Sequence, residues 1–136
     1  MFKRDFLQGE IQKLAEVLAK IIQYKRDEKF EESDELSRDT VSENFGLAWD
    51  DLVALPTDQF EKLVREKSFD PAKLDLLGQL LFESVHPFEE VEETDRILHK
   101  VLFIFRITEE EHHIQSFDNL SRRQSIDNYL NNRQYE

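Results

Sequence analysis

The sequence predicts an all-α fold of about five to seven helices. In most segments apolar side chains recur every three or four residues, which is the period of one helical face. The chain has only three glycines and three prolines, too few for a β-rich fold built on tight turns. It has 136 residues, 39% of them hydrophobic and eleven of them phenylalanine, and is expected to form a single domain over residues 1–136.

The first helix is predicted from Lys3 or Arg4 to about Tyr24 or Lys25. Gly9 lies inside it at a cost of about 1 kcal/mol relative to alanine, so it either admits a neighbouring backbone or is exposed. The apolar face that must be buried comprises Phe6, Leu7, Ile11, Leu14, Ala15, Leu18, Ile21 and Ile22.

Two further helices are predicted before residue 57. One spans about 27–44, and Gly46 is expected to end it because glycine readily adopts the left-handed conformation. A short helix over 49–55 then ends at Pro56.

The next two helices have start signals. Thr57 is expected to cap a helix that buries Phe60 and its neighbours. Asp70 caps the following helix, in which Pro71 occupies the first position, and His86-Pro87 ends it.

Two helices are predicted in the remainder of the chain. One runs from Phe88 to about residue 105, and its apolar end, from Val101 to Phe105, has a buried strand as the alternative. We favour the helix because no turn signal separates this cluster from the charged stretch before it. The last helix spans about 117–129, and the polar end at 131–136 is expected to fray.

The charge and the cysteine content exclude several functions. A net charge of −12 argues against nucleic acid and anionic membranes as partners, because phosphate binding needs lysine and arginine. The acidic surface serves solubility or, alternatively, a basic partner. Cysteine is absent, which excludes disulfides and thiolate chemistry. No signal peptide or membrane-spanning run is recognised, so a cytoplasmic protein is expected.

An internal echo points to helical hairpins. Phe30-Glu-Glu-Ser33 and Phe88-Glu-Glu-Val91 each follow a leucine-rich helix and are expected to open the next one. With Leu77-Gly78, the pattern resembles the hairpins of tetratricopeptide repeats, although the copies lie further apart than that family's period of about 34 residues. The resemblance implies stacked antiparallel helical hairpins.

The N-terminus carries a second resemblance. Met-Phe-Lys-Arg-Asp-Phe, followed by Ile11-Gln-Lys-Leu-Ala-Glu-Val-Leu-Ala, is similar to the opening helix of a family of small uncharacterised bacterial proteins. The similarity is specific over about the first twenty residues and looser to Arg106. It implies an all-helical fold and a bacterial cytoplasmic setting, and it transfers no catalytic residue.

The candidate metal ligands are Glu109, His112 and His113. On a continuous helix, Glu109 shares a face with both histidines, and paired Glu-x-x-His motifs build di-iron sites in helical bundles. A second motif is available only as Glu83 with His86, because Asp95 and His99 have the wrong spacing. Such pairs arise easily by chance in an acid-rich chain, so no metal or other cofactor is expected.

The predicted function is binding rather than catalysis. The sequence has no nucleophile elbow, phosphate-binding glycine loop or His-Glu-x-x-His motif, which favours a protein that is not an enzyme. Trp49, the only tryptophan, either packs in the core or anchors a partner. We therefore expect a scaffold or adaptor for a protein or peptide. The alternatives are a metal- or small-molecule-binding protein and a homo-oligomer that pairs through its first helix.

Overall fold

The computed structural model describes residues 2–89 and 91–134, and side chains over 5–89 and 91–132. The described residues form seven α-helices and no strand, which confirms the all-α prediction. The helices are α1 (Phe2–Arg26), α2 (Phe30–Phe45), α3 (Trp49–Ala54), α4 (Thr57–Lys67), α5 (Pro71–Val85), α6 (Glu92–Glu110) and α7 (Phe117–Gln134). The ambiguous cluster from Val101 to Phe105 lies inside α6 and is helical.

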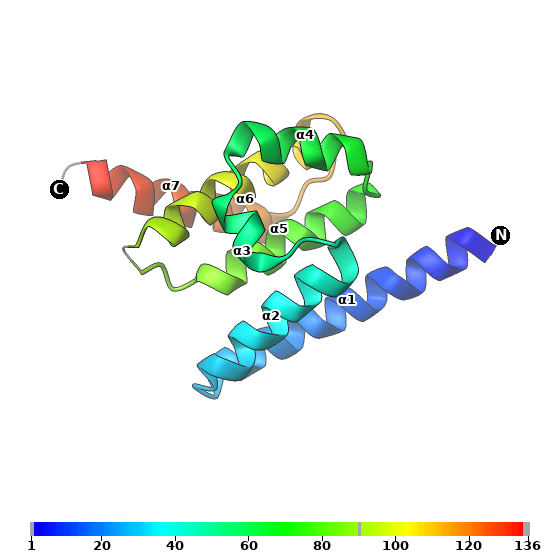
Figure 1. Cartoon of the computed structure of the whole chain (residues 1–136), viewed down its shortest axis with the longest axis horizontal. Helices are drawn as coiled ribbons and strands as arrows, with labels where there is room; N and C mark the ends of the chain where they lie inside the picture. Colours follow the sequence, from blue (N-terminus) through cyan, green and yellow to red (C-terminus); the bar gives the residue numbers. More distant parts are fainter. Residues whose placement is uncertain (1, 90, 135–136) are drawn as a thin grey trace.

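Helices α1 and α2 run side by side and are joined by a short turn (Figure 1). The predicted apolar stripe of α1 is buried at Leu14, Leu18 and Ile21, where α2 and α5 cover it. Its N-terminal turns extend beyond the other helices, and Phe6 is 75% exposed there. Gly9 has open space around it, so the structure supports the exposed-glycine interpretation rather than a close backbone approach.

The structure confirms the predicted caps at Gly46 and Asp70 and contradicts the one at Thr57. Gly46 ends α2 in the left-handed conformation, and Asp70 caps α5 by accepting a 2.9 Å hydrogen bond from the N–H of Ala72. The prediction that Thr57 caps α4 is wrong. Pro56 holds the cap position, Thr57 is already helical, and no side chain caps this helix.

Helix α6 begins at Glu92, so the prediction that Phe88 opens it is wrong. The chain passes through a cis His86–Pro87 bond, and Phe88 then packs its ring against Phe82 and Tyr129 at 5.6 and 5.0 Å. These ring contacts hold Phe88 outside the helix. Phe30 does open α2, so the two similar segments, residues 30–33 and 88–91, resemble each other in sequence and not in structure. Glu90 of the second segment lies outside the described residues.

Helix α5 lies at the centre of the fold, in contact with α1, α2 and α6 (Figure 1). Its Gly78 is buried where α6 crosses closely: an added Cβ would lie 2.8 Å from Cε1 of Phe105 and 2.9 Å from Cγ2 of Ile104. A Cβ at this position would force the side chains of Phe105 and Ile104 to move, so glycine suits this crossing of α5 and α6.

Helix α7 packs on α6 and buries Ile126. It continues through Gln134, and residues 135–136 lie outside the description, so the fraying expected at 131–136 stays a prediction. Within the described residues, no helix combines the length and apolar character needed to cross a membrane. The tetratricopeptide-like stacking of the hairpins stays a prediction.

Candidate functional site

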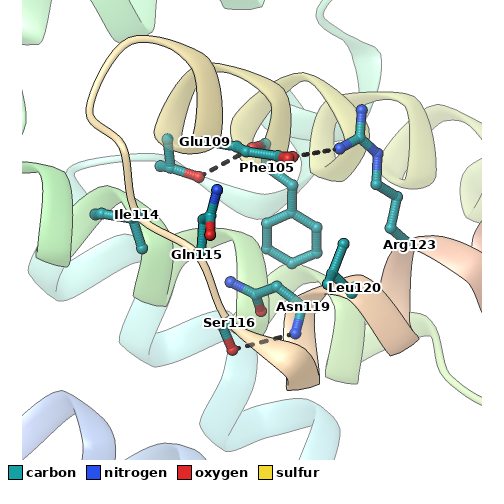
Figure 2. Close-up of a pocket in the computed structure, with 9 residues that line it drawn as sticks. Phe105, Glu109, Ile114, Gln115, Ser116, Asn119, Leu120 and Arg123 are labelled. Carbon is teal, nitrogen blue, oxygen red and sulfur yellow. Dashed lines mark hydrogen bonds and ion pairs between the residues drawn. The ribbon is translucent and has the colours of Figure 1, made fainter.

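A small cavity lies between the end of α6, the start of α7 and the loop that joins them (Figure 2). Its volume is about 150 Å³, enough for one medium-sized side chain. The ring of Phe105 projects into it from α6, and Leu120 faces it from α7. The other lining residues are Thr108, Glu109, Ile114, Gln115, Ser116, Asn119 and Arg123.

The polar groups of this cavity are engaged with one another. The carboxylate of Glu109 accepts a 2.5 Å hydrogen bond from Nη1 of Arg123, which the dashed line in Figure 2 marks. Asn119 donates from its side-chain amide to Asp75 at 2.6 Å and from its backbone to Oγ of Ser116 at 3.3 Å. With its charges paired in this way, the cavity offers an apolar interior rather than reactive groups.

The histidines predicted beside Glu109 do not share a helical face with it. Helix α6 ends at Glu110, and a backbone hydrogen bond from Ile114 to Thr108 closes the turn that follows. His113 lies in this turn with a positive φ of 58°. Nowhere in the described part of the chain do three acidic or histidine side chains meet in a group able to hold a metal ion.

A larger groove lies between α2, α3 and the connection from α5 to α6. Its volume is about 330 Å³. Two of its rim residues, Phe30 and Val91, are among the exposed large apolar side chains, with exposures of 54% and 47%. The complete lining is Phe30, Asp34, Arg38, Trp49, Ser84, Val85, His86, Pro87, Glu89, Val91, Glu93 and Thr94.

Trp49 forms part of the floor of this groove. It is 8% exposed, and its indole N–H donates a 2.8 Å hydrogen bond to Glu93. The guanidinium of Arg38 lies over the indole, 5.4 Å from the ring centroid. Trp49 therefore belongs mainly to the core, and it reaches the candidate surface only through the edge that lines the groove.

The groove is acidic. It holds the carboxylates of Asp34, Glu89 and Glu93 against one guanidinium, that of Arg38, which lies 4.0 Å from Glu93. Partial burial raises the pKa of Asp34, while Arg38 opposes that rise. The neighbouring carboxylates of Glu89 and Glu93 raise the pKa further, and the Lys25 ammonium lowers it. Within the described residues, Asp34 and Glu89 form no ion pair of their own.

His86 adds no positive charge to the groove at neutral pH. Its imidazole stacks on Phe82 with the ring centroids 5.2 Å apart and meets the edge of Phe88. Burial lowers its pKa, and the Lys25 ammonium lowers it further, although Glu83 opposes both effects. Imidazole is ordinarily half-protonated near pH 6.5, so a lowered pKa leaves it neutral at pH 7.

The comparisons with known proteins give no relative. No protein-family model, curated protein or solved structure matches the chain. The resemblance of its N-terminal segment to a bacterial family stays a prediction, and the site rests on its own geometry.

Sequence reasoning identified Trp49 but missed most of the groove. The rim residues Phe30 and Val91 were assigned to helix starts, and Asp34 and Glu89 are two of thirty acidic residues with no distinguishing pattern. No local pattern distinguishes these residues, because the exposure of the Phe30 ring depends on how the helices pack.

Proposed function

We propose that this protein is a non-enzymatic adaptor whose groove binds a segment of another protein that carries lysine or arginine next to an apolar residue. One observation carries the proposal: the groove combines an exposed apolar rim with an excess of carboxylates. A cytoplasmic, bacterial setting, implied by the N-terminal resemblance, belongs to the same proposal.

The rim supports an apolar contact. Phe30 lies in α2 and Val91 in the turn before α6. They are far apart in the sequence, yet both line the groove. Each leaves about half of its surface in water, and apolar groups beside a groove are typical of sites that a partner covers.

The carboxylates support a basic partner. The groove has three carboxylates and only one guanidinium in its lining, so it attracts a cation. The overall charge of −12 favours the approach of that cation from a distance. A bound ammonium or guanidinium next to Asp34 also relieves the repulsion that Glu89 and Glu93 impose on it.

Selection of random phage-displayed peptides on the wild-type protein tests the proposal. The enriched peptides are expected to place lysine or arginine beside an aliphatic or aromatic residue. Affinity for a selected peptide, measured by fluorescence anisotropy, is expected to fall about tenfold in Asp34→Asn and in Phe30→Ala, a loss of about 1.4 kcal/mol each.

Matched controls exist outside the groove. Asp39→Asn makes the same charge change elsewhere on α2, and Phe6→Ala removes an exposed ring from the far end of α1. Both are expected to bind like the wild type. Enrichment of acidic or uncharged peptides, or equal losses in the groove variants and the controls, would overturn the proposal.

Self-association through α1 is the second candidate, and the exposure of Phe6 on the projecting turns of α1 favours it. Light scattering over a range of concentrations distinguishes the two. A dimer that Phe6→Ala converts to a monomer supports self-association, whereas a wild-type monomer at every concentration excludes it.

A further inference from the structure

A buried lysine lies outside the groove and has no acidic partner. Lys100 in α6 is 1% exposed, and no carboxylate of the described residues lies within ion-pairing distance of its ammonium. Its one hydrogen bond goes to the backbone oxygen of Arg96 at 3.4 Å, and the ring of Phe60 lies 5.9 Å away. Burying a charge in this way is costly unless something compensates it.

Lys100 lines a cavity of about 260 Å³ between the end of α3, the start of α4 and α6. The rest of the lining is Ala54, Leu55, Pro56, Thr57 and Arg96. Arg96 brings a second cation, whose only ion pair in the described structure is with the exposed Glu92 one turn away. The cavity is lined by two cations and no carboxylate.

The start of α4 adds unused hydrogen-bond donors. No side chain caps this helix, and the N–H groups of Thr57, Asp58 and Gln59 have no acceptor within the described residues. The first turn of a helix presents such groups together with the positive end of the helix dipole. Thr57 and Lys100 both line the cavity, so an anion bound there would lie near the start of α4 and near the lysine.

We propose that this cavity binds a small oxyanion, a phosphate or carboxylate group, with Lys100 as its buried charge partner and the start of α4 as its second wall. Arg96 covers the anion from the side nearest solvent. The cavity shares no lining residue with the groove, so the proposed anion binding does not depend on the proposed adaptor function.

The electrostatics of Lys100 agree with this assignment. Burial lowers its pKa, and Arg96 lowers it further, so the free protein holds the ammonium at a cost. A bound oxyanion opposes both effects and raises the pKa of Lys100, because an opposite charge nearby favours the charged form. Ligand binding to the folded state alone then raises the melting temperature.

Thermal unfolding in sodium phosphate, compared with sodium chloride of equal ionic strength, tests the site. Wild-type protein is expected to gain several degrees in phosphate. Lys100→Met is expected to melt about 5 °C higher than wild type without phosphate, because a buried charge is removed. In phosphate it is expected to keep only the small general stabilisation that this anion gives folded proteins. Lys62→Met, an exposed lysine of α4, is expected to respond like the wild type.

Two further arms complete the experiment. Sodium acetate distinguishes a carboxylate from a phosphate site: a Lys100-dependent rise with either anion supports the proposal. Amide NMR shifts of Thr57, Asp58 and Gln59 during titration of the wild type report the site without any variant, and Lys100→Gln replaces the methionine variant if that one does not fold. The proposal is overturned if neither anion exceeds chloride, or if the lysine variants keep the full rise.

Discussion

Gly78 and Gly9 are both helical glycines, yet their surroundings predict opposite effects of alanine. Gly78→Ala places a Cβ under 3 Å from two side-chain atoms of α6, and overpacking of a core costs about 1–3 kcal/mol. The gain in helix propensity of about 1 kcal/mol offsets part of this. We expect a net loss of about 1 kcal/mol in the free energy of unfolding, measured by urea denaturation.

Gly9→Ala is the matched control for that substitution. Open space surrounds Gly9, so only the propensity gain remains, and the variant is expected to be more stable by up to about 1 kcal/mol. Equal destabilisation by both substitutions would contradict the close approach of α5 and α6.

Single residues also mark where sequence reasoning ends. The burial of Leu14 and Leu18 follows from helical period alone, and both are in the core. The pairing of Glu109 with Arg123 depends on how α7 docks on α6, and no local pattern announces it. Spacing alone therefore predicted that His112 and His113 share a helical face with Glu109, but the helix ends at Glu110, before either histidine.

At the scale of elements, helices α4 and α5 start in different ways although the sequence has a good capping residue at the start of each, Thr57 and Asp70. Asp70→Ala is expected to cost about 1 kcal/mol, because the carboxylate accepts from the N–H of Ala72. Thr57→Ala, in phosphate-free buffer, is expected to change stability by at most about 0.5 kcal/mol, because no cap is lost. Urea denaturation of both variants checks the pair, and a larger loss in Thr57→Ala would show that a cap forms at α4 after all.

The start of α6 also differs from the one that the local sequence predicts. Its sequence is typical of a helix from Phe88 onward, but contacts of that ring with Phe82 and Tyr129 hold Phe88 outside the helix, which begins at Glu92. The backbone oxygen of Glu89 also accepts a hydrogen bond from the hydroxyl of Tyr129, at 3.1 Å. Tertiary contacts here override local propensity, and they create one wall of the groove.

The whole molecule is expected to unfold in one cooperative step. The core is continuous from Leu14 in α1 to Ile126 in α7, with α5 linking the two parts. Trp49, the only tryptophan, reports the middle of this core, while far-UV circular dichroism reports all helices. The two unfolding curves in urea are expected to coincide. An earlier transition in circular dichroism alone would indicate that the α1–α2 hairpin unfolds as a separate unit.

The sequence by itself determined the class of fold and the approximate position of every helix. Periodicity, glycine and proline act over a few residues, so their effects are written locally in the chain. Only the tertiary structure decided the candidate sites: the groove gathers Phe30, Trp49 and Val91 from three segments, and the cavity proposed to bind an oxyanion is lined by both Thr57 and Lys100. Such sites depend on the angle and depth at which helices pack, and those follow from the whole core rather than from any one segment.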